Sequence, residues 1–234
     1  MYSKPVAINS KTHRDLKIAP VKDYGFARGF NSCILTGHEF VDASKDYPVV
    51  FMGSNDRITP VAVLGIKSNL FVDEEGKWEE GAYVPGYIRR VPFILAEGLA
   101  ADGSLTVCVD SEYAGFDAKE GMRLFTDEEE QTPELKKIIE FLRIYNNQHA
   151  ITGVFTSLLK SLNLFKAVDA NITLAKGGKF TLKNLLMVDE KALMKLQDSE
   201  IVSMVRQGFM GWIYAHLFSL GSFKKILERS GRGK

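Results

Sequence analysis

The hydrophobic pattern of the chain is clearest from Thr132 to Phe165. Apolar or partly apolar residues recur there every three or four positions, as on the buried face of a helix. Thr132 can cap the first turn, and Pro133 suits the next position because its missing N–H would have no partner there. The spacing keeps its phase across Asn146-Asn147 and Gly153, so it predicts one long helix. The repeating positions are Leu135, Ile138, Ile139, Leu142, Tyr145, His149, Thr152, Phe155, Leu158, Leu159 and Leu162.

The first half of the chain alternates short apolar runs with turn residues, which is typical of an antiparallel sheet. Between two of these runs, Thr36-Gly-His-Glu39 has the spacing in which Thr and Glu side chains cap each other's backbone N–H groups. We therefore expect a structural role for Glu39 and a helix after it. Strands are predicted at residues 32–36, 47–52, 60–66, 69–73, 93–96, 105–110 and 121–125.

The last third of the chain predicts a hairpin followed by helices. Two strand-like runs flank Lys176-Gly-Gly178, a sequence suited to a tight turn. The stretch 209–220 is apolar nearly all round, so we expect a helix buried in the core. The fold class predicted is α+β: a mostly antiparallel sheet packed by a long central helix, with a C-terminal hairpin and helices. We expect a single compact domain over residues 1–234, β-rich over 24–131 and helix-rich over 132–234.

Length and composition add few restrictions. A chain of 234 residues and 26.1 kDa can bury a sizeable core without metal or disulfide support. Its two cysteines, Cys33 and Cys108, lie in apolar runs and are expected to be buried free thiols, which suits a reducing compartment. The first twenty residues lack the apolar run of a signal peptide, and no stretch is long enough to span a bilayer. We therefore expect a cytoplasmic protein with no transmembrane span.

The formal net charge of +1 conceals an uneven distribution. Residues 1–131 carry 14 Lys and Arg against 21 Asp and Glu, whereas residues 132–234 carry 16 against 8. Two interpretations remain open: the halves attract each other within the chain, or the basic end from Lys224 to Lys234 contacts an acidic partner or an anionic lipid surface. We expect no nucleic-acid partner, because no recognised motif accompanies the charge.

Two adjacent arginines are the first candidates for ligand binding. Arg89 and Arg90 follow Tyr87 in an aromatic stretch, and together they could form a fork for a carboxylate or phosphate. The alternative is that one of them pairs with the acidic loop 73–80. In the loop itself, the alternating carboxylates of a calcium site are absent.

Three further polar residues are candidates for a site. Asp110 and Glu112 lie two positions apart at the end of a predicted strand, where they could hold a divalent cation or serve the turn. His216 lies in the predicted buried helix and could be a functional group or a hydrogen-bonded core residue. We predict no resident metal and no cofactor, because none of the usual ligand spacings occurs.

Several stretches, in this order, resemble the SapC-like family of bacterial proteins over nearly the whole chain. The resemblance implies little about mechanism, because the family takes its name from a member associated with a bacterial surface layer and has no established catalytic residues. The matching stretches are Thr36-Gly-His-Glu-Phe40, Tyr47-Pro-Val-Val-Phe51, Pro60-Val-Ala-Val-Leu-Gly65, Asn69-Leu-Phe-Val72, Tyr83-Val-Pro-Gly-Tyr-Ile-Arg-Arg90, Pro92-Phe93, Leu185-Leu-Met-Val-Asp189, Tyr214-Ala-His-Leu217 and Ser219-Leu-Gly221.

Two functions follow as hypotheses. The first is an intracellular accessory or adaptor protein that binds a protein or peptide partner and is linked to cell-surface biogenesis, because no catalytic motif is present. The second is an enzyme, or an enzyme's partner subunit, in which Arg89 and Arg90 hold a small anionic substrate and His216 or Asp110 assists as acid or base. The catalytic residues of such an enzyme are unknown.

Overall fold

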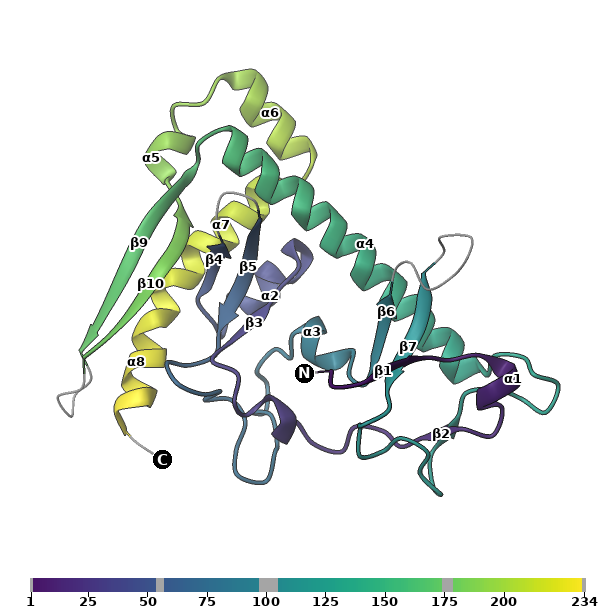
Figure 1. Cartoon of the computed structure of the whole chain (residues 1–234). Coiled ribbons are helices and arrows are strands. Elements are labelled where there is room, and N and C mark those ends of the chain that lie inside the picture. The colour runs from purple at the N-terminus through teal and green to yellow at the C-terminus, as the bar shows by residue number, and fades with distance from the viewer. Residues whose placement is uncertain (1, 54–56, 97–104, 174–178, 233–234) are drawn as a thin grey trace. The chain divides into compact units, whose positions relative to one another are not determined.

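The computed structural model describes residues 2–53, 57–96, 105–173 and 179–232, with side chains except in 170–184 and 231–232. Antiparallel sheets, one long helix and a group of C-terminal helices make up the chain (Figure 1). The predicted α+β class is confirmed.

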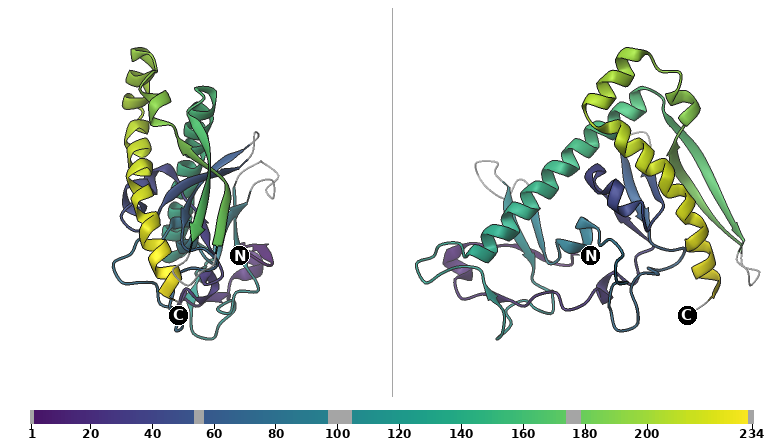
Figure 2. Two further views of the ribbon diagram at one scale, coloured as in Figure 1. Left: turned by 90° about the vertical axis from the view of Figure 1, so that its left-hand side faces the viewer. Right: turned by 180° about the vertical axis from the view of Figure 1, so that it is seen from behind.

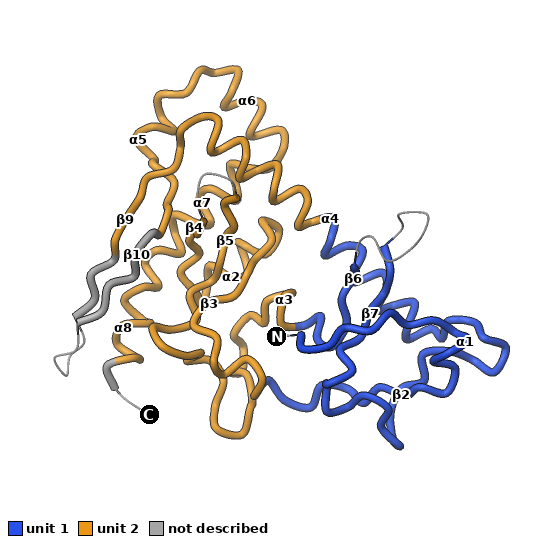
Figure 3. Tube along the Cα trace, in the orientation of Figure 1, with its two compact units in different colours: residues 1–24, 89–147 blue, residues 25–88, 148–234 orange. Residues whose placement is uncertain are grey.

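The chain divides into two compact units, coloured separately in Figure 3. Unit 1 holds Met1–Tyr24 and Arg89–Asn147, and unit 2 holds Gly25–Ile88 and Gln148–Lys234. Each unit thus combines segments from the β-rich and the helix-rich parts of the sequence. That the whole chain forms a single domain stays a prediction.

Unit 1 is built on an antiparallel sheet in the order β1, β7, β6. These strands span Pro5–Ala7 (β1), Thr106–Asp110 (β7) and Phe93–Ala96 (β6), and a separate pair joins β2 (Lys17–Ile18) to β8 (Met122–Arg123). A short helix, α1 (Ser10–His13), lies between β1 and β2 in the sequence. Phe93, Val109, Leu135 and Leu142 share one buried apolar cluster, so the sheet packs against the first part of the long helix.

Unit 2 contains a five-stranded antiparallel sheet in the order β3, β5, β4, β10, β9. The C-terminal hairpin joins the N-terminal strands through β10 and β4, where Leu185 is opposite Met52 and Leu186 is opposite Phe51. The predicted hairpin is confirmed, although Lys176, Gly177 and Gly178 of its turn lie outside the described residues. The strands are β3 (Ser32–Ile34), β4 (Val49–Gly53), β5 (Ile58–Val63), β9 (Phe165–Thr173) and β10 (Lys179–Val188).

The helices of unit 2 cover this sheet. Helix α7 contacts β4 and β10, and α8 continues it along the same face (Figures 1 and 2). Gly208 follows α6 in a left-handed conformation with φ +76°, which ends that helix before the apolar helix α7 begins. The helices are η1 (Gly25–Ala27), η2 (Gly37–Glu39), α2 (Phe40–Ala43), α3 (Gly86–Arg89, whose last residue belongs to unit 1), α5 (Glu190–Leu193), α6 (Asp198–Arg206), α7 (Phe209–Ser219), η3 (Leu220–Ser222) and α8 (Phe223–Arg232).

The long helix, α4 (Pro133–Ser161), forms as one continuous element. The Thr132 hydroxyl accepts a hydrogen bond from the Leu135 N–H at 3.3 Å, so the predicted cap is confirmed. In unit 2, the second half of α4 places Phe155 in an aromatic core with Phe40, Phe51, Phe209 and Trp212. Among the helices of the described residues, none combines the length and apolar character needed to cross a membrane.

One predicted strand, at residues 69–73, is wrong. The segment forms only an isolated bridge between Val72 and Trp78. The Asn69 side chain accounts for this. It is buried, accepts a hydrogen bond from the Phe71 N–H at 2.9 Å and donates one to the Ala27 carbonyl at 3.3 Å. An Asn side chain that bonds to nearby backbone groups in this way favours a turn over a strand.

Candidate functional site

The two arginines predicted to bind an anion lie in unit 1 and stack on aromatic rings. The Arg89 guanidinium carbon is 5.4 Å from the ring centroid of Phe141. The Arg90 guanidinium carbon is 5.4 Å from the ring of Tyr2 and 5.3 Å from the ring of Tyr145. All three distances lie within the range of a cation–π interaction, so these contacts help to hold unit 1 together.

The acidic loop of residues 73–80 is bound by other arginines. Arg28 donates to the carbonyl oxygens of Asp73 and Glu74 at 3.1 and 2.7 Å, and Arg229 of α8 pairs with Glu79. Arg229 also lies over the ring of Phe71, at 4.7 Å. Part of the basic C-terminal segment is therefore paired within the chain, which supports the intramolecular interpretation of the charge distribution.

Asp110 of unit 1 anchors the N-terminal strand. Its carboxylate accepts hydrogen bonds from the backbone N–H groups of Ser3, Lys4 and Glu112 at 2.9, 2.9 and 3.2 Å. Burial by itself would raise the pKa of Asp110, but these donors and the nearby N-terminus together hold that pKa below its usual value. The Glu112 side chain is exposed. In the part of the chain that the structure describes, no group of three or more His, Cys, Asp or Glu residues could hold a metal ion.

His216 of unit 2 is 0% exposed and bonded on both sides of its ring. Its Nδ1–H donates to the Val49 carbonyl at 2.7 Å, because a carbonyl can only accept, and its Nε2 accepts from the Val188 N–H at 3.1 Å. The ring thus joins β4 to the end of β10. Burial lowers the pKa of His216 from its ordinary value of 6.5 to about 4, against the opposing effect of the bond to Val49.

Glu39 forms a second buried polar centre in unit 2, and its predicted structural role is confirmed. One carboxylate oxygen accepts from the Thr36 N–H, as in a capping box, and it also accepts from the Thr36 hydroxyl. The other accepts from the Tyr83 hydroxyl at 2.9 Å and the Gly86 N–H at 2.6 Å. We call Thr36, Gly37, Glu39, Tyr83 and Gly86 the Glu39 cluster.

A pocket near this cluster, which we call the α4 pocket, has a volume of about 780 Å³ and lies within unit 2. It is lined by residues of α4 between 149 and 161, by Asn163, by Leu35 and by residues 57–60, which lead into and begin β5. Three basic side chains are among the described residues that line it: Arg57, His149 and Lys160. The described residues that line it include no Asp or Glu. Such a pocket suits an anionic group.

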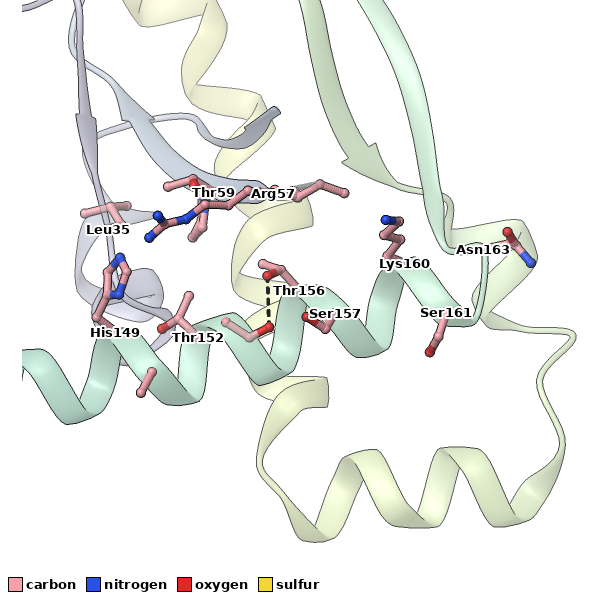
Figure 4. Close-up of a pocket in the computed structure, with 14 residues that line it drawn as sticks. Leu35, Arg57, Thr59, His149, Thr152, Thr156, Ser157, Lys160, Ser161 and Asn163 are labelled. Carbon is pink, nitrogen blue, oxygen red and sulfur yellow. Dashed lines mark hydrogen bonds between the residues drawn. The ribbon is translucent and has the colours of Figure 1, made fainter. Parts of the chain in front are cut away.

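Figure 4 shows how these side chains are arranged. Arg57 and His149 extend toward each other at one end of the pocket, and Lys160 rises from α4 toward the other end. Between them, the Thr156 hydroxyl donates to the Gly153 carbonyl at 3.2 Å, and the Thr152 hydroxyl donates to the Gln148 carbonyl at 2.6 Å. Thr152 and Thr156 are only 3% and 5% exposed, so these two hydroxyls mainly serve the fold of the pocket wall.

A comparison with known families identifies the chain. A family model described as SapC matches residues 8–226. The protein belongs to the SapC family. Neither the curated proteins nor the solved structures include a match to this SapC-family chain.

Most of the stretches that carried the family resemblance lie in unit 2 of this SapC-family protein, whereas Arg89-Arg90 and Pro92-Phe93 belong to unit 1. Thr36-Gly-His-Glu39 and Tyr83-Val-Pro-Gly86 are joined by the Glu39 carboxylate. His216 and Ser219 both bond to the backbone of Val49, so Tyr214–Gly221 and Tyr47–Phe51 are joined as well. The motifs therefore mark the polar supports of this unit.

None of the six ligand-binding candidates predicted from the sequence lines the α4 pocket. Arg89, Arg90, Asp110 and Glu112 belong to unit 1, whereas Tyr87 and His216 belong to unit 2. Sequence reasoning missed Arg57, His149 and Lys160 because Arg57 is separated from the other two by about ninety to a hundred residues of sequence. The lone signal was that His149 interrupts the apolar repeat of the long helix. A ligand role for the six candidates stays a prediction.

The lowered pKa of His216 predicts how stability depends on pH. Between pH 6.5 and about 4 the unfolded chain binds a proton that folded His216 does not, so stability falls as pH falls through this window. The histidine should contribute a loss of about 3 kcal/mol between those limits. Urea unfolding, followed by the fluorescence of Trp78 and Trp212, both in unit 2, should show this loss.

A matched pair of variants isolates the contribution of this ring. His216→Gln should be less stable than the parent at pH 7 but should lose less stability on acidification, because the titrating group is gone. His38→Gln, at an exposed position, should keep the parent's pH dependence. If the free energy of unfolding of His216→Gln falls with pH as steeply as that of the parent, the assignment of this pH dependence to His216 is contradicted.

The two stacked arginines should differ in their effect on stability. Arg90 contacts two rings and is half-buried, whereas Arg89 contacts one ring and is exposed. We expect Arg90→Ala to lower the Tm by about 4 °C and Arg89→Ala by about 1 °C. Thermal melts monitored by circular dichroism measure both, with the exposed Lys136→Ala as control. Equal losses would show that the second ring contact adds nothing.

Proposed function

We propose that this SapC-family protein is a non-catalytic accessory protein that binds an acidic segment of a protein or peptide partner in the α4 pocket. The observation that carries the proposal is the lining of that pocket. Arg57 and Lys160 are exposed cations that line it, and His149 adds an imidazole. An acidic side chain is the complementary group in proteins.

Two of the hydroxyl groups that line the pocket, those of Thr152 and Thr156, support binding over catalysis. A nucleophilic Ser or Thr needs a neighbouring base that takes its proton. Thr152 and Thr156 instead donate their protons to carbonyl groups of α4 itself. Thr152 also accepts the Gly37 N–H at 2.8 Å, which makes it a support of the fold.

The proposal also includes the cellular compartment and the process in which the protein acts. Cys33 and Cys108 are free and buried, and a protein that keeps such thiols suits the reducing cytoplasm. The family resemblance supports a link with bacterial surface biogenesis. The alternative function, an enzyme or enzyme partner with a small anionic substrate at Arg89 and Arg90, rests on the sequence alone.

Binding of a defined acidic peptide tests the proposal. A fluorescein-labelled peptide of alternating Glu and Ser should bind the whole protein, as measured by fluorescence anisotropy. Arg57→Gln and Lys160→Gln should each weaken binding by about tenfold, because each removes one charge-assisted hydrogen bond. An uncharged peptide of alternating Gln and Ser should not bind.

A control separates the pocket from general charge effects. Arg206→Gln removes an exposed cation of α6, outside the pocket, and should change the affinity by less than about twofold. If Arg206→Gln and Arg57→Gln weaken peptide binding equally, the affinity depends on the overall charge of the protein. That result would contradict a role for the pocket.

A further inference from the structure

Helix α6 carries two exposed valines on one side. Val202 and Val205 are 46% and 57% exposed, and they lie three positions apart, so they are neighbours on the helix surface. Met204, on the opposite side, is buried. Figures 1 and 2 show α6 at the end of unit 2 where α4 ends and β9 begins. Two exposed apolar side chains are common on a protein surface, so the residues beside them decide what this side of α6 could meet.

Two opposite charges flank the valines on the same side of α6. Asp198 lies four positions before Val202, and Arg206 lies four positions after it, so the three form one row along the helix. Both charged residues are exposed. They are about 12 Å apart along the axis at 1.5 Å per residue, which is too far for them to pair with each other. We call Asp198, Val202, Val205 and Arg206 the α6 stripe.

The charges of the α6 stripe have no partner within the described part of the chain. The ion pairs that the structure gives to the described residues include neither Asp198 nor Arg206. The other carboxylate of α6, that of Glu200, accepts from the Gln197 N–H at 2.9 Å and so serves the start of the helix. The stripe therefore presents one negative end, one positive end and an apolar middle.

This order of charges is complementary to itself when it is reversed. If a second copy of α6 packs antiparallel to the first, with a two-fold axis at Val202, Asp198 of each copy lies opposite Arg206 of the other. Such a contact is isologous, so each ion pair forms twice. Val202 meets its counterpart between the two ion pairs, and Val205 packs beside it. A second copy of the chain therefore supplies every group that the stripe requires.

A partner with one sign of charge fits the α6 stripe less well. An anionic surface would be attracted by Arg206 and repelled by Asp198, and a cationic surface would experience the reverse. The two effects largely cancel, because both charges lie on the same side of the helix. The stripe favours a partner that carries both charges about 12 Å apart with an apolar contact between them.

We infer that two copies of this protein associate through their α6 stripes, packed antiparallel about a two-fold axis at Val202. A contact confined to one nine-residue helix is small, so the dimer should be weak, with a Kd of about 100 µM. The described residues that line the α4 pocket include none from α6, so this inference does not depend on the proposed function.

Sedimentation velocity of the whole chain measures the association. The parent should change from monomer to dimer as its concentration rises through about 100 µM. An increase in NaCl concentration from about 0.05 M to about 0.5 M should weaken the dimer by about fivefold, because salt screens ion pairs between exposed groups.

Charge reversal at single positions tests the pairing. Asp198→Lys gives the stripe two positive charges, and Arg206→Glu gives it two negative charges. Each variant alone should dimerise about tenfold more weakly than the parent, because like charges then face each other. An equal mixture of the two variants should form a heterodimer about as tight as the parent dimer, because every charge then faces its opposite.

Further variants serve as controls. Lys136→Glu changes the net charge as Arg206→Glu does, at an exposed position of unit 1, and should dimerise like the parent. Val202→Gln should weaken the dimer by about tenfold, because it places amides at the apolar centre. Circular dichroism confirms that each variant is folded. If a charge reversal unfolds the chain, the neutral variants Asp198→Asn and Arg206→Gln replace it, and each should weaken the dimer by about threefold.

Each outcome decides for or against the α6 contact. Recovery of the dimer on mixing supports it, because a defect in folding would not be repaired by a second defective chain. The inference is overturned if the parent stays monomeric at about 1 mM. It is also overturned if the charge-reversed variants dimerise as tightly as the parent, or if both lose the dimer and their mixture does not recover it.

Discussion

The carboxylate of Glu39 is the interaction on which the rest of unit 2 depends. It is 5% exposed, and a charge so buried is costly unless donors surround it. Two donors come from Thr36, one from Tyr83 and one from Gly86. The carboxylate therefore joins two loops that are separated by more than forty residues, and removing any donor would leave part of a buried charge without a partner.

The same cluster positions the helix that forms the pocket. The Gly37 N–H donates to the Thr152 hydroxyl at 2.8 Å, which ties the Glu39 cluster to α4. Glycine is required here because a Cβ at this position would come within 2.2 Å of the Trp212 ring. Leu35, directly before the cluster, lines the α4 pocket. The hydrogen bond between Gly37 and Thr152 therefore links the Glu39 cluster to α4 at the wall of the pocket.

The features that sequence could predict are those whose cause is local. The long helix follows from its apolar repeat and the Thr132 cap, and the turn before α2 follows from the spacing of Thr36 and Glu39. The prediction of a strand at 69–73 was wrong because β propensity takes no account of the Asn69 side chain. That side chain forms hydrogen bonds with backbone groups that lie near it in space. Local reasoning succeeds where neighbours in sequence are also partners in space.

The site depends instead on contacts between distant segments. Arg57 and residues of the second half of α4 line the same pocket only because β5 and that half of the helix lie in the same unit. The sequence spacing of these residues does not predict it. In unit 1, the stacking of Arg90 between Tyr2 and Tyr145 joins three separate segments in the same way. The two arginines stood out in sequence because they are adjacent, yet each is placed by rings elsewhere in the chain.

Hydrogen–deuterium exchange with and without a saturating acidic peptide tests the central claim most directly, because it locates binding without any substitution. If the peptide binds in the α4 pocket, amide exchange should become slower in the second half of α4 and in residues 57–60. The exchange of the amides of unit 1 should not change. Slower exchange confined to unit 1, or none in the second half of α4 while the peptide is bound, would contradict it.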